Sequence, residues 1–67
     1  MSNKQRRRML KAAAGRLAAL LHTTPASILA ADAQALGVMV RALISGPVRD
    51  SRFGDARRLA NKVIRLR

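Results

Sequence analysis

The chain has 67 residues, which is enough for one small domain, and we expect residues 1–67 to form a single basic helical domain. Its 14 Lys and Arg against three Asp and no Glu give a net charge of +11, which should attract polyanions, nucleic acid first among them. The absence of cysteine excludes disulfides and thiolate metal sites, and it fits a reducing compartment such as the cytoplasm. Because alanine and leucine dominate the apolar residues and aromatic residues are nearly absent, the composition predicts an all-α fold.

The first predicted helix covers residues 4–22, where Leu and Ala recur every three or four residues and His22 ends the pattern. Its start carries a cluster of bases: Lys4, Arg6, Arg7, Arg8 and Lys11. Helix N-termini favour acidic side chains, and the first carboxylate in the sequence is Asp32, so local stability does not explain this cluster. We therefore expect that residues 1–8 can be disordered in the free protein and that they become ordered when they bind a phosphate backbone.

The second predicted helix covers residues 25–45. Thr24 is its expected N-cap with Pro25 in the first turn, and Gly46 followed by Pro47 is its expected end. Most of its circumference is apolar, so the sequence predicts burial on several sides and a homodimer packed through this helix. The expected dimer interface consists of Ile28, Ala33, Leu36, Gly37, Val40, Leu43 and Ile44.

Asp32 stands out within this second helix. On one continuous helix its carboxylate lies on an apolar face, where an unpaired charge is costly, so we expect a structural salt bridge to an arginine. The alternative for this residue is that the helix is exposed at Asp32. A helix-turn-helix over residues 29–46 is the alternative, because Ala33 and Gly37 have the spacing used where two such helices meet. One continuous helix is favoured, because Asp32 occupies an apolar position of that motif.

The third predicted helix covers residues 55–67, opened by Asp55, which should pair with Arg58 one turn later. Phe53 is expected in the preceding turn, where it would fix the loop to the core. The basic face of this helix could lie along phosphates or enter a major groove. Together the two basic ends give the predicted nucleic-acid-binding residues: Lys4, Arg6, Arg7, Arg8, Lys11, Arg57, Arg58, Asn61, Lys62 and Arg65.

Catalysis and metal binding have no support in the sequence. His22 is the only histidine, and it has no cysteine or nearby carboxylate to complete a metal site, so we expect no metal, no cofactor and no enzyme activity. Phe53 is the only aromatic residue, which argues against folds that stack single-stranded bases.

The sequence therefore predicts a small nucleic-acid-binding protein, for DNA or RNA, that regulates or packages nucleic acid in a phage, plasmid or bacterial setting. The first alternative is a protein-interaction module that docks on an acidic surface of a host enzyme and modulates it. The second is an amphipathic protein of the membrane surface, which the lack of boundary aromatics disfavours. No signal peptide is recognised, and charges interrupt the longest apolar run, so a transmembrane helix is not expected.

Overall fold

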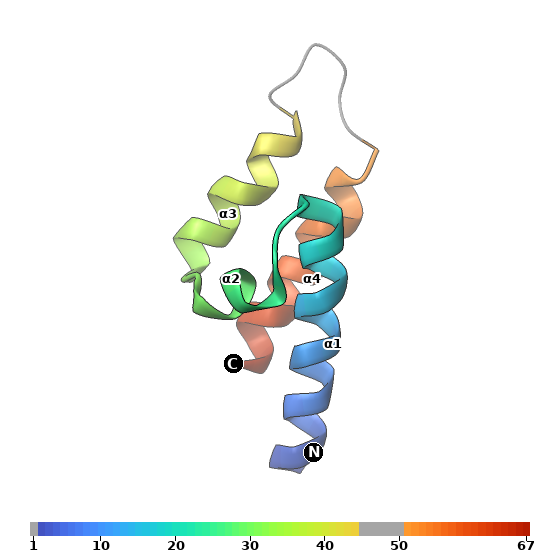
Figure 1. Ribbon diagram of the computed structural model, residues 1–67, viewed down its shortest axis with the longest axis vertical. Coiled ribbons are helices and arrows are strands. Elements are labelled where there is room, and N and C mark those ends of the chain that lie inside the picture. Colours follow the sequence, from blue (N-terminus) through green and yellow to red (C-terminus); the bar gives the residue numbers. More distant parts are fainter. Residues whose placement is uncertain (1, 45–50) are drawn as a thin grey trace.

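The computed structural model describes residues 2–44 and 51–67, and the fold is all-α (Figure 1). The described residues form α1 (Asn3–Leu21), α2 (Pro25–Ala30), α3 (Ala33–Arg41), the 3-10 turn η1 (Ala42–Ile44) and α4 (Phe53–Leu66), with no strand among them. The first and third predicted helices are confirmed as α1 and α4, although α4 begins two residues earlier than expected. The predicted end of the second helix at Gly46 and Pro47 lies outside the described residues.

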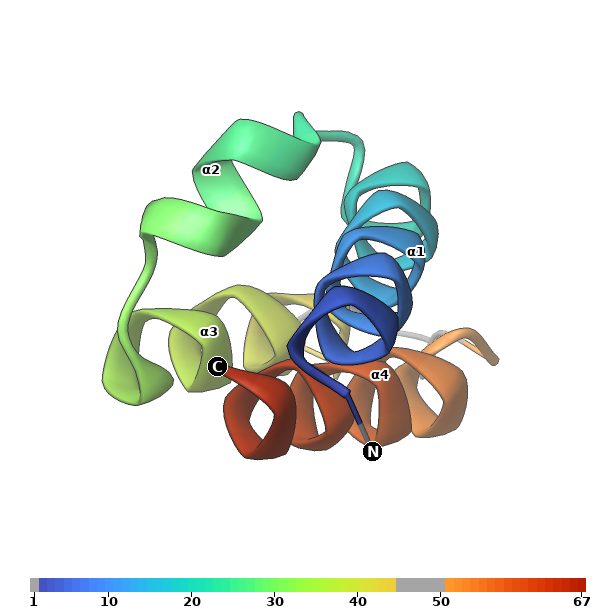
Figure 2. The same cartoon turned by 90° about the horizontal axis from the view of Figure 1, so that it is seen from below.

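The helices pack around α4, which lies between α1 and α3, while α2 packs against α1 (Figure 2). Each α-helix contributes one large, fully buried side chain to the shared core: Leu17, Ile28, Leu36 and Val63. The rest of the buried core of α1 and α4 is mostly alanine: Ala13, Ala14, Ala18, Ala56 and Ala60. Because the spacing between helix axes depends on the side chains at the contact, this alanine seam lets α1 and α4 approach closely.

The connection between α1 and α2 follows the sequence signals. His22 ends α1 in the left-handed conformation at φ 56°, and the Thr23 amide donates to the Ala18 carbonyl oxygen at 2.9 Å, as in a Schellman motif. Thr24 caps α2 as predicted, because its hydroxyl accepts a hydrogen bond from the Ser27 amide at 3.2 Å and Pro25 follows it.

The prediction of one continuous helix over residues 25–45 is wrong. Ala31 and Asp32 have extended backbone conformations that separate α2 from α3. The break lets α2 pack on α1 and α3 pack on α4, which a straight helix of that length could not do at once. The helix-turn-helix alternative also fails in its expected register, because Ala33 and Gly37 both lie inside α3 rather than at a turn.

Asp32 has a different role from the salt bridge that was expected of it. Its carboxylate is exposed and accepts a hydrogen bond from the Ala35 amide at 2.7 Å, so Asp32 is the N-cap of α3. No Lys or Arg among the described residues is within ion-pair distance of it. The error followed from the assumed continuous helix, since an aspartate at the start of a new helix satisfies a free amide and needs no arginine.

Substitution of Asp32 separates the two roles. Asp32→Ala should lower the free energy of unfolding by about 1 kcal/mol, because α3 loses its cap. Asp32→Asn should retain most of that stability, since asparagine caps helices as well as aspartate does. Thermal denaturation followed by far-ultraviolet circular dichroism measures both variants. An equal loss in both would mean that the charge, and not the cap, stabilises the fold.

The predicted dimer interface is also corrected. Ile28, Leu36 and Val40 are buried in the core of the single chain, so they are not free to face a second copy. Leu43 is half-buried and packs against the same core. The remaining three predicted interface residues line an open groove between α3 and α4: Ala33, Gly37 and Ile44. The break at Ala31 is the reason, because it folds most of the apolar surface of the predicted helix inward.

Candidate nucleic-acid interface

The first turns of α1 project beyond the other helices (Figure 1). Residues 3–8 are all exposed, and Ala13 is the first residue of α1 that is buried in the core. We call residues 3–11 the basic arm. At 1.5 Å per residue the arm is about 13 Å long, and it contributes to the elongated shape of the molecule, which measures 43 × 19 × 17 Å.

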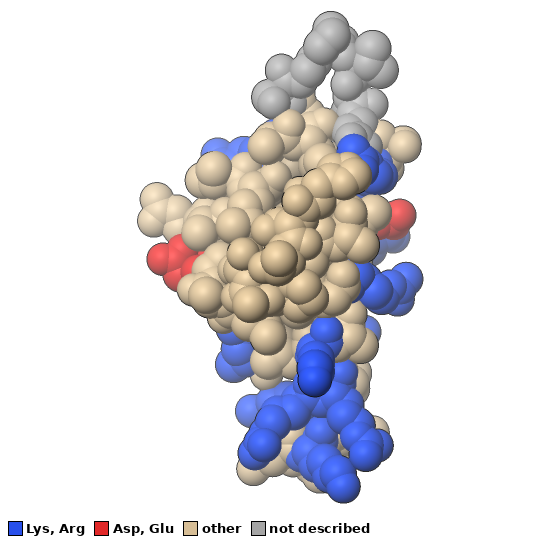
Figure 3. Space-filling view, viewed as in Figure 1, with Lys and Arg blue, Asp and Glu red and all other residues tan. Residues whose placement is uncertain are grey.

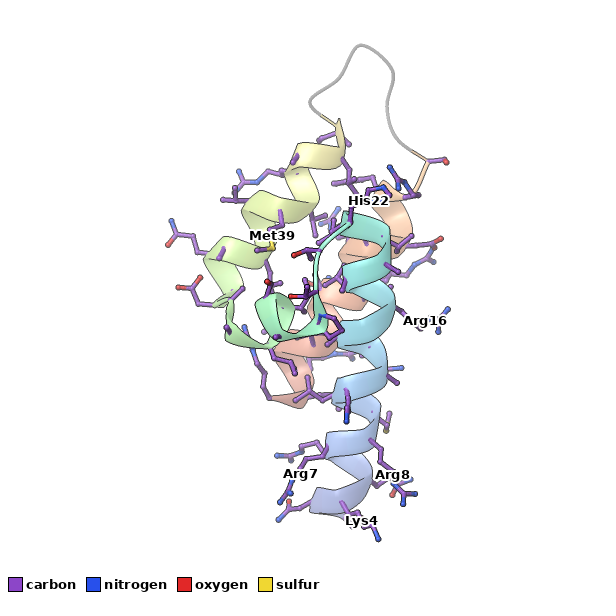
Figure 4. The ribbon with its side chains drawn as sticks, in the orientation of Figure 1. Lys4, Arg7, Arg8, Arg16, His22 and Met39 are labelled. Carbon is purple, nitrogen blue, oxygen red and sulfur yellow. The ribbon has the colours of Figure 1, made fainter. Side chains whose placement is uncertain are left out.

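The basic side chains cover much of the surface of the arm (Figure 3). Lys4, Arg7, Arg8 and Lys11 surround one shallow hollow together with Asn3, because residues three and four apart lie on the same side of a helix. In Figure 4, Lys4 stands at the tip of the helix, while Arg7 and Arg8 point to opposite sides of it. Arg6 does not line this hollow. On the helical wheel it lies on the same side of α1 as the apolar stripe.

The basic arm holds its charges without acidic partners. None of its five bases makes an ion pair or a hydrogen bond with another described side chain. Lys4 and Arg8, like Arg7 and Lys11, are like charges four residues apart and disfavour the helix by about 0.2–0.5 kcal/mol per pair. The bases therefore do not stabilise the fold, and they remain available to an external anion.

A capping interaction at Ser2 starts the arm as a helix. The Ser2 hydroxyl accepts a hydrogen bond from the Gln5 amide at 3.1 Å. Ser2 and Gln5 have the Ser-x-x-Gln spacing of a capping box, a start signal that the sequence interpretation missed. The structure thus describes residues 3–8 as helical, and the expectation that they can be disordered in the free protein stays a prediction.

The second predicted surface lies on α4. Arg58, Asn61, Lys62 and Arg65 line a second open hollow together with Ile64. Arg58 also forms the predicted pair with Asp55, at 2.8 Å between Nη2 and Oδ1, with both side chains largely exposed. An exposed pair of this kind contributes little to stability, but it partly neutralises Arg58. This surface is therefore less free for an external anion than the basic arm.

The two basic surfaces lie on different helices and line separate hollows. The basic arm is the start of α1, and the second surface lies on α4, which packs against α1. The hollow on the basic arm and the hollow on α4 share no residue.

Two arginines outside the predicted site serve the fold. Arg52 Nη1 donates to the Leu20 carbonyl oxygen at 3.3 Å and lies 2.9 Å from His22 Nε2. Because a guanidinium only donates, this histidine nitrogen accepts. Arg67 Nη1 donates to the carbonyl oxygens of Leu29, at 3.3 Å, and of Ala31, where the turn after α2 leaves them free of helix partners. Both arginines tie segments that are distant in sequence to helix ends.

Two other features are absent from residues 2–44 and 51–67. These residues contain no group of three or more His, Cys, Asp or Glu placed to hold a metal ion. In the same ranges, no helix combines the length and apolar character needed to span a membrane. Comparisons with protein-family models, with curated proteins and with solved structures found no match, so the function has to be argued from the residues of this chain.

Proposed function

We propose that the protein binds nucleic acid by placing the basic arm against the phosphate backbone. The observation that carries the proposal is the arm itself, a helix that projects from the body with Lys4, Arg7, Arg8 and Lys11 around one hollow and no acidic partner among the described residues. Phosphates would accept hydrogen bonds from these side chains and release condensed counterions, which is a strong and sequence-independent source of affinity.

The shape of the arm suits a duplex. A helix with its side chains is about 10–12 Å across, which matches the width of the B-DNA major groove at about 12 Å. Because residues 3–8 extend past the other helices, the arm can approach a groove without a collision between the duplex and the body of the protein. Phe53, the only aromatic residue, is half-buried at the start of α4, so stacking on exposed bases is not supported.

The α4 surface is a second contact in this proposal and supplies any base recognition. Arg57, Asn61 and Arg65 are exposed and carry the side-chain types that read guanine and adenine edges. Since this surface and the basic arm line separate hollows, the α4 surface would engage a further stretch of the same nucleic acid or a second segment. The small size and high charge favour an accessory protein that regulates or packages nucleic acid, in a phage, plasmid or bacterial setting.

The salt dependence of binding tests the proposal. Titration of dye-labelled DNA and RNA duplexes should show affinity that falls with salt by about 0.9 log units per log unit for each phosphate contacted on B-DNA. Five arm residues would give a slope of about −4.5 at most from the arm alone. Because the protein has no Trp or Tyr, ultraviolet absorbance of a purified sample also reports co-purified nucleic acid with little background. Absence of salt-sensitive binding to either duplex would refute the proposal.

A further inference from the structure

An open apolar groove of about 450 Å³ runs between α3 and α4, apart from the basic arm. Its floor is made of small or buried residues, among them Gly37, Val40 and Ala60. Ala33 and Ile44, which line it at opposite ends of the α3 side, are eleven residues apart, so the groove is roughly 16 Å long at helical rise. That length accommodates about three turns of a helix.

The sides of the groove expose aliphatic surface. Ile44 is 40% exposed and Ile64 is 38% exposed, and both line the groove from opposite helices. Large aliphatic side chains left in contact with water beside an apolar groove are typical of a surface that a partner covers.

Gly37 supplies an independent observation. It lies inside α3 with no positive φ angle, so its backbone does not require glycine. A Cβ atom added there would meet only the guanidinium of Arg41, at 4.0 Å. Glycine in the interior of a helix is less stable than alanine, so Gly37 lowers the stability of α3 although its backbone conformation does not require glycine. Arg41 Nε also donates to the Gly37 carbonyl oxygen at 3.5 Å, so a larger side chain at Gly37 would occupy the groove beside the Arg41 guanidinium.

The rim of the groove fixes the charge of the occupant. Arg41 on α3 and Arg57 on α4 are both exposed and line the groove, and none of the described lining residues is acidic. A second copy of the chain would bring a second net charge of +11 and a second pair of rim arginines to this site. A partner with acidic residues would instead place carboxylates against the guanidinium groups.

We propose that the groove between α3 and α4 binds an amphipathic helix of another protein, with its apolar face on Gly37 and Ala60 and its acidic flanks on Arg41 and Arg57. The groove is separate from the basic arm, since it contains none of the arm's residues, but it shares Arg57 and Asn61 with the α4 surface of the proposed nucleic-acid site. Small residues on the floor allow a docked helix to approach both α3 and α4 closely, which extends the existing helix packing by one element.

The probe is a synthetic peptide of about 14 residues with Leu on one face, Glu on its flanks and a single Trp. Because the protein has no Trp or Tyr, the fluorescence of the peptide reports binding directly. A scrambled peptide of the same composition controls for non-specific attraction to a protein of charge +11, and a version with Lys in place of Glu tests the rim. Both control peptides should bind at least about tenfold more weakly, and amide NMR signals of Gly37 and Ala60 should shift with the Leu–Glu peptide only.

Variants of the groove complete the test. Gly37→Leu should fill the groove, raise the melting temperature and weaken the peptide at least about tenfold, while Gly15→Leu, the matched change in α1, should leave peptide affinity unaltered. Arg41→Glu with Arg57→Glu should reverse the preference between the Glu and Lys peptides, which tests the rim without filling the groove.

Four results would overturn the proposal. The first is equal binding of the ordered and scrambled peptides, and the second is undiminished peptide binding by Gly37→Leu. The third is a wild-type dimer in sedimentation analysis that Gly37→Leu converts to a monomer, because the occupant would then be a second copy. If a duplex displaces the peptide from wild type, and Gly37→Leu loses the duplex as well, the groove belongs to the nucleic-acid site and the proposal also fails.

Discussion

Reversal of the four clustered charges Arg6→Glu, Arg7→Glu, Arg8→Glu and Lys11→Glu should weaken duplex binding at least about 100-fold at moderate salt. Each reversal removes a phosphate contact and replaces it with repulsion of the backbone. The fold should remain intact or become slightly more stable, because acidic side chains in the first turns of a helix interact favourably with its dipole, by about 0.3–1 kcal/mol each. Fluorescence anisotropy of a labelled duplex and thermal denaturation measure the two effects on the same sample.

A matched set of reversals on α4 separates the position of the charges from their number. Reversal of Arg57, Arg58, Lys62 and Arg65 to Glu changes the net charge by the same amount, from +11 to +3. This second variant should lose less affinity than the arm variant, because Arg58 is already paired with Asp55 in the native protein. It should also be less stable, since basic residues favour the C-terminal end of α4. Equal loss of affinity in both variants would show that net charge alone drives binding.

The outer helices were predictable because their signals are local. The apolar spacing in α1 and α4, the cap at Thr24 and the pair between Asp55 and Arg58 all depend on residues within a turn or two of each other. The basic arm was predictable for the same reason, since an unpaired cluster of bases at a helix start is visible in the sequence itself.

The break between α2 and α3 was missed because it depends on tertiary packing. Ala, Leu and Gln on both sides of Asp32 all favour helix, so propensity gives no reason to stop. The chain turns there because the turn brings Ile28 and Leu36 into one core, and Asp32 then caps the new helix. The groove was missed for the same reason, since its walls come from α3 and α4. A glycine within a helical pattern, Gly37, was the only local sign of it.

Stability and the proposed binding surface lie in separate parts of α1. Residues 3–8 make no contribution to the buried core, whereas Leu17 and Ala14 on the same helix are fully buried. Changes in the arm can therefore alter affinity with little effect on the fold, and changes in the core should alter the fold with little effect on the chemistry of the arm. A core substitution tests the second half of this statement.

Leu17→Ala should produce the largest loss of stability among the substitutions considered. Leu17 has no exposed surface, and truncation of such a side chain costs about 2–5 kcal/mol. A domain of 67 residues has a total stability of about 3–10 kcal/mol at 0.05–0.15 kcal/mol per residue, so much of the margin is removed. The melting temperature should fall by at least about 10 °C, as measured by far-ultraviolet circular dichroism.

Leu29→Ala is the control for this substitution, because it removes the same atoms from a side chain that is 39% exposed, and it should cost less than about 1 kcal/mol. Below its own melting transition, Leu17→Ala should still bind a duplex with nearly native affinity, because the basic arm and its cap at Ser2 are unchanged. A Leu17→Ala protein that melts like the wild type would show that α1 does not pack on α4. Loss of duplex binding while the variant is still folded would show that the arm depends on the core, and that phosphate contact by a projecting helix is not a sufficient account of binding.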